Sequence, residues 1–212
     1  MFYDPRSEPH GLPHDPWTAL VVPRPIGWIS TMSAQGVPNL APYSFFNAVS
    51  ARPPFVMFAS GSRKDTLANA EATGVFAVNL ATAGMRRAVN RTSTVWAPDV
   101  NEFEEAGLSM ADCRNIPCGR VAQSPVCIEC RLTQTVRLRP STGAACDGIV
   151  AFGEVVGIHI DPGILVDGLI DVARLQPLGR LGYMDYTVIE TAFTMARPAV
   201  PDAEKRMRAS DV

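Results

Sequence analysis

The sequence predicts a mainly β protein whose strands close into a barrel of Greek-key type, with a few short helices. Six or more segments alternate, or run apolar, over strand lengths between Gly, Pro, Asn and Asp residues, while the helical patterns are short. Closing the sheet into a barrel removes the exposed strand edges. No repeat and no break in composition marks a second domain, so residues 1–212 are expected to form one domain.

Residues 1–16 form an irregular arm rich in Pro, and this irregular stretch is expected to extend to residue 23. Gly36 marks a hairpin turn, and the Pro53–Pro54 pair fits only before a strand because proline cannot donate to a ladder. The expected strands are 26–32, 40–49, 55–59, 75–80, 126–138, 148–161 and 186–194.

Helices are expected at 66–73, 83–90 and 171–175. Asp65 is a good N-cap for the first of these, and Gly74 closes it. The segment 91–124 is predicted to be a long loop with at most one helical turn, at 101–106. Loops of this length are usually functional or lie over a partner subunit. The charged tail at 198–212 is expected to fray.

Composition limits the kinds of partner. Hydrophobic residues make up 47% of the chain and charged residues 19%, as in an ordinary globular protein. The net charge of -2 gives no electrostatic reason to expect nucleic acid or a membrane surface. No apolar run could span a bilayer, and the N-terminus has no secretion-signal pattern. We therefore expect a cytoplasmic protein.

The cysteine pair Cys127 and Cys130 has the spacing of a redox or zinc site. The surrounding residues alternate as in a strand, however, and positions three apart on a strand point to opposite faces. The sequence has no second Cys/His pair at zinc-finger spacing. The favoured interpretation is therefore that both cysteines are small residues packed in a sheet.

The loop from Ser60 to Thr66 is the best anion site in the chain. It contains Ser60, Gly61, Ser62, Arg63, Lys64, Asp65 and Thr66, directly before a helix. Lys64 and Arg63 supply charge, while Thr66 and the free N–H groups of the first helical turn supply donors. Asp65 would repel a phosphate unless it caps the helix. A solvated loop with an ordinary helix cap fits the same residues, and the loop alone does not exclude it.

Two strands before this loop combine polar and aromatic residues. The first contains Ser30 and Thr31, and the second contains Tyr43, Ser44, Phe45, Phe46 and Asn47. A flat ring needs an apolar platform with polar groups at its edge. Together with the anion loop, these strands indicate a phosphorylated aromatic cofactor, with flavin mononucleotide (FMN) as the best candidate. Core strands with satisfied polar residues remain an alternative.

Two further candidates lie late in the chain. Arg180 could pair with a carboxylate or phosphate of a substrate, and Tyr183 could stack on a ring. His159 is the only histidine within a predicted strand, and both a donor role and a structural role are open to it. The fingerprints of Rossmann domains, P-loop NTPases, zincins and α/β-hydrolases are absent from the sequence.

Several blocks, in this order, resemble the flavin reductase-like proteins with the FMN-binding split barrel fold. They are PRPIGWIST, GVPNLAPYSFFNAVSARPPFVMF, KDTLANAEATGVFAVNL, NEFEEAGLS and LGRLGYMDY, and the resemblance covers residues 17–198. The resemblance implies a homodimer with FMN near the subunit interface. It also implies that Ser60–Thr66 holds the phosphate, with Lys64 and Thr66 the positions carried over most directly.

The same resemblance implies reduction of flavin by NADH or NADPH, without a catalytic acid or base from the protein. His159, Arg180 and Tyr183 are placed over the open face of the flavin, and Asn90 and Ser93 in a loop that covers it. Some members feed reduced flavin to a monooxygenase, whereas others bind FMN and transfer electrons without a nicotinamide site. Both activities are therefore expectations for this chain.

Overall fold

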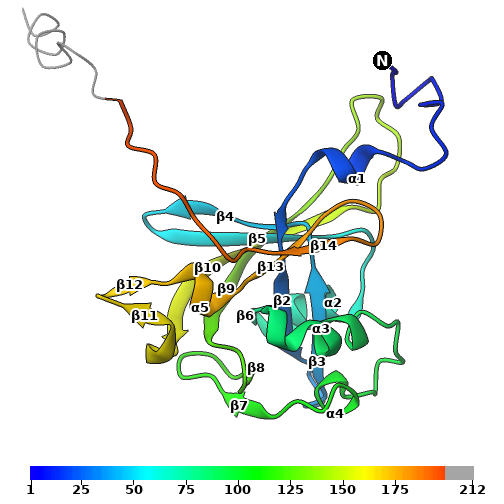
Figure 1. The fold of residues 1–212 in the computed structure, drawn as a ribbon. Helices are drawn as coiled ribbons and strands as arrows, with labels where there is room; N and C mark the ends of the chain where they lie inside the picture. Colours follow the sequence, from blue (N-terminus) through cyan, green and yellow to red (C-terminus); the bar gives the residue numbers. More distant parts are fainter. Residues whose placement is uncertain (199–212) are drawn as a thin grey trace, which may run out of the picture.

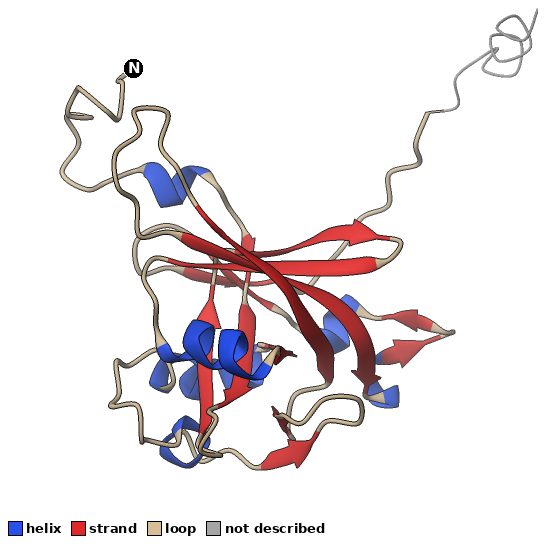
Figure 2. Cartoon of the chain, turned by 180° about the vertical axis from the view of Figure 1, so that it is seen from behind, coloured by secondary structure: helices blue, strands red, loops and turns tan. Residues whose placement is uncertain are grey.

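The computed structural model describes residues 1–198. Its largest element is an antiparallel sheet with strand order β3-β2-β6-β9-β10-β5-β4 (Figure 1). In chain order these strands are β2 (Gly27–Met32), β3 (Pro38–Tyr43), β4 (Phe46–Ala51), β5 (Pro54–Ser60), β6 (Val75–Leu80), β9 (Val126–Arg137) and β10 (Ile149–Ile160). Figure 2 shows that the strands cross one another instead of lying in one flat layer.

Smaller elements surround this sheet. A second sheet has the order β1-β13-β14, and two hairpins are formed by β7 with β8 and by β11 with β12. Their strands are β1 (Arg24–Pro25), β7 (Met110–Asp112), β8 (Gly119–Val121), β11 (Leu165–Val166), β12 (Leu169–Ile170), β13 (Leu178–Arg180) and β14 (Tyr186–Val188). The helices are α1 (Trp17–Leu20), α2 (Asp65–Thr73), η1 (Ala83–Met85), α3 (Arg86–Arg91), α4 (Glu102–Glu105), η2 (Pro162–Ile164) and α5 (Val172–Leu175).

The large sheet is rolled, because its two edge strands are neighbours in sequence. Only Ser44 and Phe45 separate β3 from β4, so the end of one edge strand lies beside the start of the other. The Ala59 N–H on β5 donates to the Phe45 carbonyl at 2.8 Å and holds this link against the sheet. The mainly β, split-barrel prediction is confirmed, with a gap in the ladder between β3 and β4.

Alternation along the strands divides the core between the two faces of the sheet. Phe76 and Val78 of β6 pack with Ile29, Phe58 and α2 on one face. On the other face, Val75 and Ala77 pack against residues of the 113–118 loop, while Trp28 packs near α3 and α4 in a third cluster. Cys130 lies in the first of these clusters and Cys127 in the second, so the prediction that the two thiols point to opposite faces is confirmed.

Several predicted boundaries were wrong. The strand expected at 40–49 is broken at Ser44 and Phe45, where the chain passes between the sheet edges. The segment 91–124 contains the β7–β8 hairpin as well as α4. The strand expected at 186–194 ends at Val188 and pairs with β13 outside the large sheet. A helical turn, α1, occurs at residues 17–20, within the stretch to residue 23 that was expected to be irregular.

Helix α2 begins at Asp65, one residue earlier than predicted. Its N-cap is Lys64, which is extended at φ -88°, so Asp65 is already helical and does not serve as the cap. Gly74 closes the helix in the left-handed region, as predicted. The tail predicted at 198–212 lies, after residue 198, outside the described residues. Within residues 1–198, none of the helices has the length and apolarity that crossing a membrane requires.

A test of core packing concerns Gly153 on β10. A Cβ atom there would lie 2.4 Å from Cζ of the buried Phe76. We predict that Gly153→Ala lowers the free energy of unfolding by about 1–3 kcal/mol, because the core must shift to admit the methyl group. Gly84→Ala is the matched control, since nothing lies within 4 Å of its added Cβ. Urea unfolding measures both, and equal stability of the two variants would contradict the packing.

Candidate functional site

A cavity of about 540 Å³ opens where the rolled sheet meets the start of α2. Three segments line it: the end of β3 with Ser44 and Phe45, the end of β5 with the loop up to Thr66, and the chain from Thr92 to Trp96. The first two segments are neighbours because the Phe45 carbonyl accepts from the Ala59 N–H. Trp28 Nε1 donates to the Thr92 hydroxyl at 2.8 Å and fastens the third segment to the barrel.

The structure gathers about half of the predicted site residues here. Those that line the cavity are Tyr43, Ser44, Phe45, Ser60, Lys64, Asp65, Thr66 and Ser93. Those that do not are Ser30, Thr31, Phe46, Asn47, Arg63, Asn90, His159, Arg180 and Tyr183. The residues missed from sequence are Asn39, Thr92, Trp96 and Glu102, which come from a strand, from the chain after α3 and from the start of α4, without a motif of their own.

The N-terminus of α2 presents donors without acceptors. No side chain caps it, and within residues 1–198 no hydrogen bond is found for the N–H groups of Asp65, Thr66 and Leu67. Lys64 stands directly before them and lines the same cavity. Free N–H groups at a helix start, the positive end of the helix dipole and an ammonium group together favour an anion. Because Asp65 does not cap the helix, its negatively charged carboxylate still opposes the binding of an anion here.

A buried polar network holds this helix start in place. Asn39 of β3 donates from Nδ2 to the Thr66 hydroxyl at 2.9 Å and to the Thr31 hydroxyl at 3.2 Å. Asn69 of α2 adds a bond to Thr31 at 3.3 Å. Asn39, Thr31 and Thr66 are all buried. Thr31 therefore fixes α2 against the sheet from behind the cavity and does not line it.

Tyr43 contributes a buried hydroxyl beneath the loop. Its ring packs on Phe58 at 5.0 Å between centroids, and its hydroxyl oxygen has no hydrogen-bond partner in the described chain. Burial raises the pKa of Tyr43, and the neighbouring Thr66 and Ser60 hydroxyls offset part of that rise. A buried, protonated phenol without a partner is costly for the protein alone. This hydroxyl is therefore a donor available to a ligand.

Glu102 provides a second carboxylate away from the helix start. It lies at the beginning of α4, is buried, and accepts the Leu40 N–H at 3.0 Å. Burial raises the pKa of Glu102, and the negative charge of Asp65 adds to that rise. Its hydrogen bond joins α4 to β3, so this group fixes the wall as well as lining it.

Trp96 gives the outer wall a fixed aromatic ring. The Arg91 guanidinium lies over the indole at 4.5 Å, and Arg91 is itself held by Glu105 at 2.7 Å. The indole Nε1 is buried and has no partner among the described residues. With Phe45 and Val95, Trp96 supplies the apolar part of the cavity, and its N–H is a further unused donor.

Several predicted residues have other roles. Arg63 is paired with Glu71 at 2.9 Å, and Phe46 packs beneath Gly27. Ser30 is fully buried and donates to the Gly119 carbonyl at 2.7 Å. Arg180 donates to the Tyr183 carbonyl and lies 4.4 Å over the Tyr186 ring.

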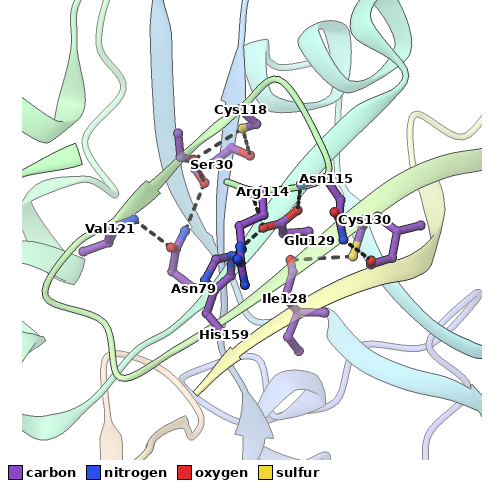
Figure 3. A network of polar contacts seen from close by, with 12 residues as sticks. Ser30, Asn79, Arg114, Asn115, Cys118, Val121, Ile128, Glu129, Cys130 and His159 are labelled. Atoms are coloured by element: carbon purple, nitrogen blue, oxygen red, sulfur yellow. Dashed lines mark hydrogen bonds and ion pairs between the residues drawn. The ribbon is translucent and has the colours of Figure 1, made fainter. Parts of the chain in front are cut away.

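His159 faces a different part of the molecule. Its Nε2 contacts the buried carboxylate of Glu129, on the face of the sheet that the 113–118 loop covers (Figure 3). Burial by itself raises the pKa of Glu129. Hydrogen bonds from the Arg114 and Asn115 N–H groups and from His159 outweigh burial and lower the pKa below its usual value.

The cavity fits a phosphorylated aromatic molecule. Its anion end has the free α2 N–H groups and Lys64, its walls include Phe45 and Trp96, and its interior holds the unpartnered Tyr43 hydroxyl. Sites of this kind, mostly concave with a few convergent donors, are typical of cofactor binding. Among residues 1–198 no group of His, Cys, Asp and Glu is suited to a metal ion.

Comparisons with known proteins agree with this geometry. The family model described as "Flavin reductase like domain" matches residues 19–175. An uncharacterized protein of Aquifex aeolicus is 37% identical over 169 residues, which cover 77% of this chain and 83% of that protein.

Two solved structures are similar throughout. Nitrilotriacetate monooxygenase component B from Bacillus cereus has a TM-score of 0.84 at 27% identity, covering 92% of this chain and 98% of that one. A Shewanella frigidimarina protein, assigned as a flavin reductase with a split barrel domain, has a TM-score of 0.73 at 21% identity, covering 87% and 90%, and shows the fold alone. With the family model matched over most of its length, the chain belongs to the flavin reductase-like family.

Proposed function

We propose that this protein is an FMN-binding oxidoreductase that uses NADH or NADPH to reduce flavin. Membership of the flavin reductase-like family supports a flavin-related oxidoreductase. The observation that carries the choice of FMN is the open N-terminus of α2 beside Lys64, because a phosphate group satisfies its free N–H groups.

Each part of the cavity has a role in this proposal. The N–H groups of Asp65, Thr66 and Leu67, with Lys64, would hold the phosphate. Phe45, Val95 and Trp96 would exclude water from the ring, and the Tyr43 hydroxyl would donate to the cofactor. Bound FMN would supply the hydride-accepting chemistry, so the protein's own residues need only bind and align the two molecules.

We also propose that the protein works as a homodimer in the cytoplasm. Ile158 and Ile160 lie two apart on β10 and are 58% and 46% exposed on one face, beside Ile128 and Val126 of β9. A second copy of the chain would cover this apolar strip. His159, Arg180 and Tyr183 line no part of the cavity within one chain, so a role for them at the flavin would require a second subunit to bring them there.

A flavin-dependent monooxygenase is the proposed acceptor of the reduced flavin. The structure with a TM-score of 0.84 is the B component of a monooxygenase, and the two chains match over nearly their full lengths. The alternative, an electron-transfer protein without its own nicotinamide reaction, uses the same FMN cavity.

The activity is tested by adding NADH or NADPH anaerobically to the FMN-loaded protein. We expect the visible absorbance of the flavin to be bleached, and steady NAD(P)H oxidation to rise when free FMN is added. If dithionite bleaches the bound flavin but neither NADH nor NADPH does, the reductase proposal is rejected and the electron-transfer alternative is favoured.

The phosphate assignment is tested by Lys64→Gln. Loss of one charge-assisted contact should weaken FMN binding about tenfold, with no change for riboflavin, which has no phosphate. Arg63→Gln is the matched control, because Arg63 is paired with Glu71 outside the cavity. Flavin fluorescence titration gives both affinities. Equal effects of the two variants would place the phosphate elsewhere.

Tyr43→Phe separates stability from ligand binding. Removing a buried hydroxyl without a partner should leave the free energy of unfolding of the cofactor-free protein unchanged, or raise it by up to about 1 kcal/mol. The same change should weaken FMN binding several-fold. Tyr3→Phe, in the N-terminal arm, serves as control. A large loss of stability without loss of affinity would show that the hydroxyl is structural.

A further inference from the structure

A second cavity, of about 810 Å³, shares no lining residue with the first. It lies between the loop before β8, the start of β9 and the end of β10, where Arg114, Arg120 and His159 line it. Of its lining residues, Ile158 and Ile160 also belong to the apolar strip proposed to meet a second copy, whereas Arg114 and Arg120 have no role in the proposed flavin reaction.

One wall of this cavity is rigid. The Glu129 carboxylate is fully buried and accepts the backbone N–H groups of Arg114 and Asn115, each at 2.7 Å, as well as the contact from His159 (Figure 3). The Asn115 side chain donates to the Val156 carbonyl at 2.6 Å and ties the loop to β10. A Cβ at Gly157 would lie 3.0 Å from Asn115 Nδ2, so a glycine is needed for this close approach. The loop that carries Arg114 is therefore held in a fixed position.

The cations of this cavity lack counter-ions within the chain. Among residues 1–198, neither Arg114 nor Arg120 has a carboxylate within ion-pair distance. Arg120 Nε is buried with no hydrogen-bond partner. The Glu129 charge is already satisfied by its N–H donors and His159, and Asp161 at the rim accepts the Gly163 N–H. A buried guanidinium donor without an acceptor is costly unless an anion completes the site.

We propose that this cavity binds a small anion with at least two negative charges, carried by phosphate or carboxylate oxygens, between Arg114 and Arg120. Guanidinium groups match both kinds of oxyanion in a bidentate manner. The loop is rigid, and the Glu129 carboxylate is already hydrogen-bonded. The two guanidinium groups therefore remain available to bind the ligand. Within one chain this site shares no lining residue with the cavity proposed for the flavin.

Calorimetric titration of the full chain with inorganic pyrophosphate, and separately with succinate, tests the proposal and distinguishes the two oxyanions. The background is Lys64→Gln, so that the helix start of α2 contributes little. We expect at least one of the two compounds to bind with one-to-one stoichiometry. Arg120→Gln should weaken the affinity for that anion at least tenfold. Arg87→Gln is the matched control, because Arg87 is exposed and lines neither cavity.

Arg114→Gln is the second variant in case Arg120→Gln does not fold, since the Arg114 side chain is exposed and its N–H bond to Glu129 is kept. This variant too should weaken the affinity for the anion at least tenfold. No binding of either anion up to about 10 mM, or equal affinity of the arginine variants and the Arg87→Gln control, would overturn the proposal. FMN affinity, measured in the wild-type chain and in the arginine variants without the Lys64 change, should be equal, so failure of this site and failure of the flavin assignment are distinguishable.

Discussion

The two-residue link between β3 and β4 is the constraint on which the rest of the structure depends. Because Ser44 and Phe45 join strands at opposite edges of one sheet, the sheet must roll until those edges meet. The hydrogen bond from the Ala59 N–H to the Phe45 carbonyl fixes the meeting point. The rolled edge thus brings the 43–45 segment beside the loop that starts α2, and a cavity results.

The cavity is then held by buried polar bonds, several of which are made by its own lining residues. Asn39 joins Thr31 and Thr66, and Glu102 joins α4 to β3 through the Leu40 N–H. Polar groups in a core are costly unless satisfied, so they fix one arrangement of the elements that carry them. Polar groups left unsatisfied at Tyr43, at Trp96 and at the start of α2 lie beside this cavity, whereas the unsatisfied Arg120 Nε belongs to the second one.

The two faces of the sheet have separate chemistry. One side of β9 carries Cys130 into the core with α2, while the other carries Cys127 and Glu129 under the 113–118 loop. Because its side chains alternate, β9 supports the core behind α2 with one face and lines the second cavity, through Glu129, with the other, and the two cavities share no lining residue. This separation is what would allow a flavin and a second anion to bind independently.

The sequence by itself predicted most of the strands, the end of α2 and the position of the Ser60–Thr66 loop before that helix. Strand alternation, Gly74 and the Ser60–Thr66 composition are local signals, so 75–80, the end of α2 and the loop were predictable, as was the opposite orientation of Cys127 and Cys130. Local signals did not show that Ser30 is buried against Gly119, that His159 faces Glu129 and the second cavity, or that Trp96 and Glu102 reach the first cavity. Those placements depend on how the sheet rolls and which loop covers which face. Only the tertiary structure decides this, because it follows from contacts between residues far apart in the chain.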